Sequence, residues 1–186
     1  MKIEATELNA VYTIELEKLS DERGYFARSF CVDELADAGI EFTVDQTNIS
    51  ANRLAGTVRG MHIQMEPSPE TKIVRCVHGR IYDVVIDLRP ESISYRHWLG
   101  VEVSRENAKA VVIPPGCAHG FQTLEDDSEV HYMMQGRYDP DSAAGVRYND
   151  SVFGIDWPIP VSAVSQKDAS WPDFNPDAGL VAEHKT

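Results

Sequence analysis

The stretch that decides the fold reads KIVRCV (residues 72–77), HG (78–79) and RIYDVVIDL (80–88). The two outer segments are rich in β-branched residues, which is typical of strands, and the His-Gly pair between them predicts a tight hairpin turn. Similar short segments extend in both directions along the chain; they are residues 11–16, 42–49, 57–63, 99–103, 110–113, 120–124 and 129–134. Short strands punctuated this regularly by turn residues predict an antiparallel sandwich or barrel.

Signals for helices are few. Residues 33–38 predict one short helix, which Gly39 closes at its C-terminus. Beyond about Asp150 the chain is rich in proline and tryptophan, and we expect an irregular tail that wraps over the barrel with short helices. The whole chain has 186 residues, and a domain typically has about 100–200. We therefore expect residues 1–186 to form a single domain.

Composition makes several classes of function improbable. Seventeen Lys and Arg against thirty Asp and Glu give a net charge of −13, which disfavours binding to nucleic acid. No apolar run approaches the ~18–20 residues that cross a bilayer. Cys31, Cys76 and Cys117 are odd in number and widely spaced, which argues against a disulfide framework and fits a reducing compartment. We expect a cytoplasmic protein that binds neither nucleic acid nor membrane.

Two spacings point to a more specific class. Residues 114–119 read PPGCAH, a Pro-x-Gly-x-x-His run after a short apolar strand, which resembles the second signature of cupins, the small jelly-roll barrels. Metal-binding cupins also have a glycine-to-glycine frame that contains a His-x-His pair and a Glu. Residues 56–79 keep this frame and its first histidine, His62, but Gln64 and Lys72 stand at the second His and Glu positions.

The lysine changes the chemistry that such a pocket supports. At neutral pH Lys72 is an ammonium with three donors and no lone pair, so it would repel a divalent cation. We therefore expect no metal. An inward-facing lysine beside a histidine suits the stabilisation of a developing oxyanion next to a group that transfers a proton.

Seven segments together resemble the dTDP-4-dehydrorhamnose 3,5-epimerase family. They are DERGYF (21–26), QTNIS (46–50), GTVRGMHIQ (56–64), KIVR (72–75), YDVVIDLR (82–89), SREN (104–107) and IPPGCAHGF (113–121). The similarity continues from about residue 1 to Asp168, in register apart from single-residue slips. It implies an all-β, cupin-type jelly-roll barrel with a few short peripheral helices. It also implies a homodimer that epimerises a nucleotide sugar without a metal or an organic cofactor.

The resemblance also implies a role for each site residue. His62 matches the base that removes the acidic proton beside the carbon-4 ketone, and Asp168 matches the carboxylate that pairs with it. Tyr132 matches the phenol that returns a proton from the opposite face, and Lys72 matches the lysine that holds the enolate oxygen. Tyr138 matches a second phenol near the sugar. The other predicted substrate-binding residues are Arg23, Phe26, Arg28, Gln46, Asn48, Arg59, His119 and Lys167.

Five positions depart from the family pattern. Arg28 and Ala143 each stand where the family usually has Glu, residues 51–52 read Ala-Asn in place of a serine repeat, and Ile63 replaces an aromatic residue. None of these is the predicted base, acid or oxyanion lysine. The reaction type is therefore better supported by the sequence than the identity of the substrate.

The sequence thus predicts an isomerase that inverts carbons 3 and 5 of a nucleotide-linked 4-keto-6-deoxyhexose, with dTDP as the favoured nucleotide, in a rhamnose or related deoxysugar pathway. Three alternatives stay open. The first is an epimerase of one carbon, or of a CDP- or GDP-linked sugar, which the charge of Arg28 favours. The second is a metal-dependent cupin dioxygenase. The third is a binding module for sugar nucleotides without catalysis.

Overall fold

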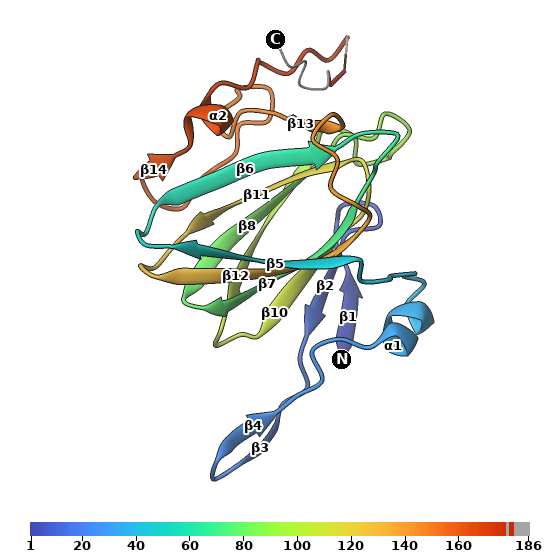
Figure 1. Cartoon of the computed structure of the whole chain (residues 1–186), viewed down its shortest axis with the longest axis vertical. Helices are drawn as coiled ribbons and strands as arrows, with labels where there is room; N and C mark the ends of the chain where they lie inside the picture. Colours follow the sequence, from blue (N-terminus) through green and yellow to red (C-terminus); the bar gives the residue numbers. More distant parts are fainter. Residues whose placement is uncertain (178, 181–186) are drawn as a thin grey trace.

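The computed structural model describes residues 1–177 and 179–180, and two antiparallel sheets dominate it (Figure 1). One sheet has the order β1 (Lys2–Ala5), β2 (Tyr12–Glu15), β10 (Lys109–Ile113), β7 (Thr71–His78), β12 (Ser128–Gln135) and β5 (Gln46–Asn52). The other has the order β13 (Ala143–Gly145), β6 (Thr57–Gln64), β11 (Cys117–Thr123), β8 (Arg80–Asp87) and β9 (Trp98–Ser104). The all-β barrel predicted from the sequence is confirmed.

The main core fills the space between these two sheets. One sheet contributes Val74, Val111 and Val130, the other contributes Val85 and Phe121, and all are almost fully buried. Farther along β7 and β12 the inward positions pass from these valines to residues that line a cavity. The polar cavity therefore lies directly next to the apolar core, along the same strands.

The prediction of a hairpin across His78-Gly79 is wrong. The strands on either side lie in different sheets: β7 pairs with β10 and β12, whereas β8 pairs with β11 and β9. Gly79 has a φ of +70°, and a Cβ added there would lie 2.5 Å from the Ser128 hydroxyl. This glycine turns the chain out of one sheet and into the other, so each strand finds its hydrogen-bonding partners elsewhere.

The one predicted helix is confirmed, with a shift of one residue. α1 spans Val32–Asp37, and beyond it the Gly39 N–H donates to Ala36 O while the Ile40 N–H donates to Leu35 O. These two bonds form a Schellman motif, which needs the left-handed conformation that Gly39 adopts. Neither α1 nor the second helix, α2 (Gln166–Ala169), is long and apolar enough to cross a membrane, and the described residues contain no other helix.

The sequence does not predict the shortest strands. The missed strands are β1, β3 (Leu19–Asp21), β4 (Gly24–Phe26), β13 and β14 (Ala163–Val164). β13 reads Ala-Ala-Gly and β14 has two residues, so neither has the β-propensity that marks a strand; both are held by pairing with β6. β5 also starts later than the predicted segment 42–49, because Phe42 packs in the cluster around Leu35.

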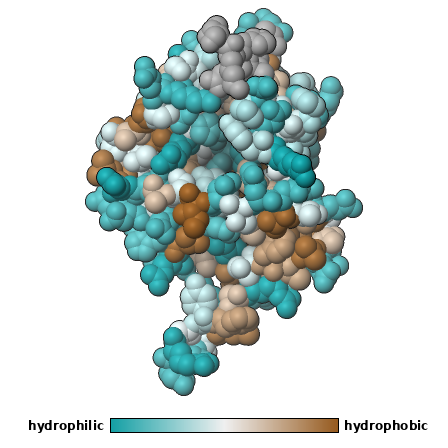
Figure 2. Space-filling view, viewed as in Figure 1, coloured by the Kyte–Doolittle hydropathy of each residue, from teal (hydrophilic) through white to brown (hydrophobic). Residues whose placement is uncertain are grey.

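Two segments extend away from the barrel in opposite directions (Figure 1). The arm, residues 19–26, is the β3–β4 hairpin; it stands clear of the body, with a hydrophilic tip (Figure 2). Its apolar side chains are exposed, and Phe26 is 74% accessible. The tail, residues 151–177, runs beside β6 at the other end and contains β14 and α2. Between residues 151 and 177 the named elements are β14 and α2.

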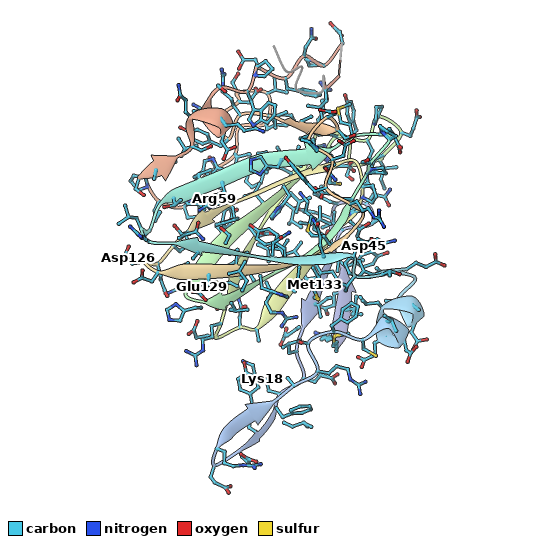
Figure 3. The ribbon with its side chains drawn as sticks, in the orientation of Figure 1. Lys18, Asp45, Arg59, Asp126, Glu129 and Met133 are labelled. Carbon is cyan, nitrogen blue, oxygen red and sulfur yellow. The ribbon has the colours of Figure 1, made fainter. Side chains whose placement is uncertain are left out.

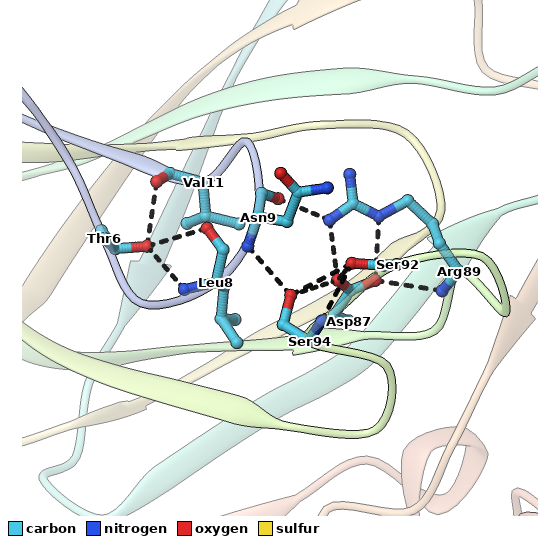
Figure 4. A network of polar contacts seen from close by, with 8 residues as sticks. All are labelled: Thr6, Leu8, Asn9, Val11, Asp87, Arg89, Ser92 and Ser94. Atoms are coloured by element: carbon cyan, nitrogen blue, oxygen red, sulfur yellow. Dashed lines mark hydrogen bonds and ion pairs between the residues drawn. The ribbon is translucent and has the colours of Figure 1, made fainter.

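A buried polar network holds the loops at the C-terminal end of β8 (Figure 4). The carboxylate of Asp87 is fully buried and accepts hydrogen bonds from Arg89, Ser92 and Ser94. Arg89 also donates to the backbone carbonyl of Asn9, and the Asn9 N–H donates to Ser94. Burial alone would raise the pKa of Asp87, but these donors lower it to about 2. The network therefore ties the β8–β9 loop to the loop that precedes β2.

Candidate active site

A cavity of about 870 Å³ lies between the sheets, with walls from β5, β6, β7, β11 and β12 and from the tail. It brings together most of the residues predicted from the sequence. The predicted residues that line it are His62, Lys72, Tyr132, Asp168, Gln46, Asn48, Arg59, His119, Tyr138 and Lys167. The structure thus collects in one place side chains that are spread over more than a hundred positions of the chain.

His62 of β6 and Asp168 of the tail form a hydrogen-bonded pair. His62 Nε2 lies 2.7 Å from Asp168 Oδ1. Asp168 Oδ2 accepts the N–H of Gly60, and the N–H of Asp168 donates to Ser165 Oγ, the N-cap of α2. Burial alone would raise the pKa of Asp168, but the hydrogen bonds, led by that from His62, hold it below its usual range. The ionised carboxylate accepts a hydrogen bond from Nε2–H, which leaves the Nδ1 lone pair free to act as a base.

β6 and β11 bring two histidines side by side, because His62 and His119 are register partners. The register slips just after His119, where glycines of the two strands approach each other closely. A Cβ added to Gly60, whose φ is +132°, would lie 2.5 Å from the Cα of Gly120. Glycine at these positions therefore permits the close approach that places both rings on the cavity wall.

His119 belongs to a second, more deeply buried pair. Its Nε2 lies 2.7 Å from Asp83 Oδ1, and both side chains are at most 4% exposed. Among the described residues the other carboxylate oxygen, Asp83 Oδ2, has no hydrogen-bond partner. The sequence does not single out Asp83. It pairs with Phe121, two residues along β11 from His119, and this neighbourhood becomes apparent only from the register of β8 and β11.

Tyr132 packs edge-on against His119, with ring centroids 6.2 Å apart. Burial raises the pKa of Tyr132 well above its usual value, and the negative charge of Asp83 raises it further. The side chain therefore stays a neutral phenol at neutral pH. A neutral phenol on the cavity wall is a proton donor.

Lys72 stands at the beginning of β7 with a carboxylate beside it. Its Nζ lies 2.8 Å from Glu70 Oε1, and both side chains are less than 10% exposed. Glu70 was not predicted from the sequence, although an acidic residue two positions before a lysine expected inside the barrel is a signal that could have found it. The ion pair holds the Lys72 ammonium at the cavity wall.

The wall formed by β5 and β6 is polar. Gln46, Asn48 and Ser50 occupy alternate positions of β5 and all line the cavity, as the two-residue period of a strand requires. Arg59 extends from β6 toward β5, where its Nε donates to Asn52 Oδ1 at 2.6 Å (Figure 3). This wall therefore offers amide groups and one guanidinium to a ligand.

Gln64 uses its amide within the protein. Its Nε2 donates to the carbonyls of Ser68 and Arg137 at 3.1 Å, and its Oε1 accepts the N–H of Asp139 at 2.7 Å. With Gln64 so engaged and Lys72 a cation, the donor set at the cupin metal positions does not fit a metal ion. Throughout residues 1–177 and 179–180, no three His, Cys, Asp or Glu side chains cluster in a way that could hold one.

Three predicted residues lie outside the cavity of this chain. Arg23 is in the tip of the arm, where it pairs with Asp21. Phe26 is exposed at the end of the arm, and Arg28 pairs with Glu34 of α1. The arm and the tail that carries Asp168 lie at opposite ends of the molecule (Figure 1). One chain by itself therefore does not unite these residues with His62.

Comparison with known proteins gives a family match over nearly the whole chain. The family model described as dTDP-4-dehydrorhamnose 3,5-epimerase matches residues 5–176. The enzyme of that name from Methanothermobacter thermautotrophicus is 39% identical over 89% of this chain and 90% of its own length. A dTDP-4-dehydrorhamnose 3-epimerase from Streptomyces niveus is 34% identical over 100% of this chain and 91% of its own length.

Solved structures agree with the sequence matches. A dTDP-4-dehydrorhamnose 3,5-epimerase from Elizabethkingia anophelis superposes with a TM-score of 0.90 at 36% identity, and the match covers 94% of this chain and 96% of the other. The Bacillus anthracis enzyme, solved with TDP and PPi bound, also has a TM-score of 0.90, at 34% identity over 93% of this chain and 99% of the other. These matches confirm the cupin-type jelly-roll fold expected from the sequence.

Proposed function

Since this chain belongs to the dTDP-4-dehydrorhamnose 3,5-epimerase family, and so to the epimerases of 4-keto-6-deoxy sugar nucleotides, we propose that it inverts carbons 3 and 5 of a dTDP-linked 4-keto-6-deoxyhexose. One observation carries the proposal: His62, Lys72 and Tyr132 line a single cavity. They supply a base, a cation and a neutral acid, which are the three groups that such an inversion needs.

The first step removes a proton from a carbon beside the ketone. His62 Nδ1 takes the proton, and the electron pair of the C–H bond moves onto the carbonyl oxygen to give an enolate. The Lys72 ammonium stabilises this oxyanion, and its charge is more effective in a water-poor cavity than in solvent. Asp168 fixes the orientation of the imidazole and balances the positive charge that His62 acquires.

The second step returns a proton to the other face of the same carbon. Tyr132 is the donor, because its raised pKa keeps the phenol protonated until the enolate forms. The electron pair moves from the enolate back to carbon, and the configuration is inverted because removal and return occur on opposite faces. Each proton transfer of this kind contributes about 10²–10⁴-fold to the rate.

The nucleotide part of the substrate is assigned to the polar wall and the mouth of the cavity. Arg59 and Lys167 are suited to the diphosphate, since cationic side chains pair well with phosphate oxygens. Gln46 and Asn48 supply hydrogen bonds, and Tyr138 contacts the nucleotide sugar at the mouth. The Bacillus anthracis relative was solved with TDP and PPi bound, which supports a nucleoside diphosphate as part of the ligand.

We further propose a homodimer in which the arm of one subunit reaches the cavity of the other. The apolar side chains of Leu19, Tyr25 and Phe26 are more than half exposed in one chain, which is unfavourable in water. Inserting the arm into a partner would bury them and bring Arg23 to a diphosphate that it does not approach in its own subunit.

Heavy water tests the reaction. With a dTDP-linked 4-keto-6-deoxyglucose, the enzyme should introduce deuterium at carbons 3 and 5, detected by proton NMR. His62→Asn should reduce turnover by about 10³-fold, within the range for a lost general base, while the dissociation constant for dTDP changes little. Deuterium at neither carbon of the dTDP-, CDP- or GDP-linked sugars would contradict the proposal.

The second candidate is an epimerase that inverts carbon 3 alone. It is favoured by the similarity over the whole chain to the 3-epimerase from Streptomyces niveus. The same labelling experiment separates the two, because this enzyme would introduce deuterium at one carbon only. Parallel assays with CDP- and GDP-linked sugars measure whether Arg28, which replaces a usual Glu, has changed the nucleotide preference.

A further inference from the structure

The side-chain amide of Gln64 forms hydrogen bonds to the backbone on both sides of Tyr138. Its Nε2 donates to the carbonyl of Arg137, and its Oε1 accepts the N–H of Asp139. One amide therefore holds the two peptide groups that flank the tyrosine. The Gln64 side chain has little freedom to move, since the residue is 4% exposed and sits at the end of β6 opposite Ala143 of β13.

These hydrogen bonds continue into the loop between β6 and β7. Gln64 Nε2 also donates to Ser68 O, and the Ser68 hydroxyl donates to Asp139 Oδ2. Asp139 accepts the Ser142 hydroxyl as well, which closes the turn after Tyr138. The loop between β6 and β7 and the loop between β12 and β13 are thus fastened to each other by Gln64, which bonds to both, and by the bonds from Ser68 to Asp139 and from the Met65 N–H to Ser142 O.

Tyr138 needs such support because its own side chain is largely exposed to solvent. It is 60% exposed, yet it lines the mouth of the cavity. A partly exposed ring contributes to binding only if its backbone is held where the ring meets the ligand, since ordering a free loop costs conformational entropy on binding. A rigid amide that holds both adjacent peptides removes most of that cost.

We propose that Gln64 is a positioning residue for Tyr138, and that it adjusts affinity for the nucleotide sugar without taking part in proton transfer. The inference rests on the proposed function for the identity of the ligand. Gln64 is 2 residues from His62 along β6, so both side chains lie on the same face of the strand. One strand therefore carries the base and the support of the binding loop.

A double-mutant cycle tests this. Gln64→Met keeps the size of the side chain and loses all three hydrogen bonds; we expect KM to rise and the affinity for dTDP to fall by about tenfold each, with kcat within about twofold. In a Tyr138→Ala background the same change should alter KM by less than about twofold, because residues that act as a unit are not additive. Equal effects in the two backgrounds would overturn the proposal.

Gln122→Met is the matched control. The Gln122 amide also hydrogen-bonds to the backbone of a loop: it donates to Ile159 O and accepts the Ile159 N–H. This loop, between β13 and β14, contributes no residue to the cavity. The substitution should lower the melting temperature with no change in KM. A KM increase equal to that of Gln64→Met would show that any loosened loop has this effect, and the proposal would fall.

Gln64→Glu covers the case in which the methionine variant does not fold. It keeps an oxygen for the Asp139 N–H and loses the donors to the two carbonyls, so its KM should lie between those of the wild type and the tyrosine variant. A wild-type KM would refute the role of Gln64. Failure of the proposed reaction is seen separately, as wild-type enzyme that incorporates no deuterium while dTDP binding still responds to Gln64.

Discussion

The molecule contains two histidine–aspartate pairs with the same geometry and different surroundings. Both have Nε2–Oδ1 distances of 2.7 Å. The His62 side chain is 46% exposed and its carboxylate comes from the tail, whereas the His119 side chain is 4% exposed and its carboxylate comes from the adjacent strand. The difference indicates that access to the cavity, more than the pair itself, separates His62, the proposed base, from His119, which forms part of the cavity wall.

The largest effect is expected for Asp168→Asn, which removes the negative charge from the His62 pair and leaves the His119 pair unchanged. The amide cannot balance the charge on a protonated His62, so we expect kcat to fall by about 10²-fold, within the range for groups that assist proton transfer. Affinity for dTDP should stay within about threefold. Steady-state kinetics with isothermal titration calorimetry measures both. A kcat close to that of the wild type would show that His62 needs no carboxylate partner.

A third buried carboxylate, Asp87, accepts several hydrogen bonds, and its lowered pKa predicts how the stability of the protein depends on pH. Its pKa is about 2 in the folded protein and 3.8 when unperturbed. A lowered pKa contributes stability that is complete above the unperturbed value and is lost as pH falls through the folded value. We expect about 2 kcal/mol to disappear between about pH 4 and pH 2.

Thermal unfolding of the wild type and of Asp87→Asn across this range checks the expectation. The variant should be less stable at neutral pH and should show a weaker dependence on acid. Equal slopes for the two proteins below pH 4 would mean that other carboxylates account for the loss.

The smallest effect is expected for Asp83→Asn. The amide oxygen still accepts a hydrogen bond from His119, but the amide nitrogen replaces an oxygen that has no partner in the described structure. We expect a loss of about 1 kcal/mol in unfolding free energy and a change in kcat below about fivefold. Urea denaturation and initial rates measure the two quantities. A loss of kcat as large as that of Asp168→Asn would make the second pair catalytic as well.

The sequence predicted the residues that sit within recognisable spacings. His62 and Lys72 were found through the glycine frame, and the resemblance supplied Tyr132. Asp168 was reached only by resemblance, because it lies 106 positions from its histidine and no local pattern links them. The helix at Val32–Asp37 was predictable from its closing glycine, since that motif is local.

What the sequence missed depends on pairing between strands. Asp83 has meaning only near His119, and this neighbour is set by the register of β8 and β11. Glu70 differs, because its position two residues before Lys72 is a local signal. The hairpin error has the same origin as the omission of Asp83, because the turn at Gly79 was recognised while the partners of its strands were not. Local chemistry marks a turn, but the competition among strands for partners decides where the chain goes next.

The position of Asp168 in the tail has a consequence for biosynthesis. All the strands of the two facing sheets except the two-residue β14 precede residue 146, so they emerge from the ribosome before the carboxylate does. The cavity wall with its histidines is translated first, and α2 then adds the partner of His62. In the proposed reaction the catalytic pair is therefore completed late in translation. A nascent chain halted before Ser165 would carry His62, Lys72 and Tyr132 but would lack the carboxylate that pairs with the imidazole.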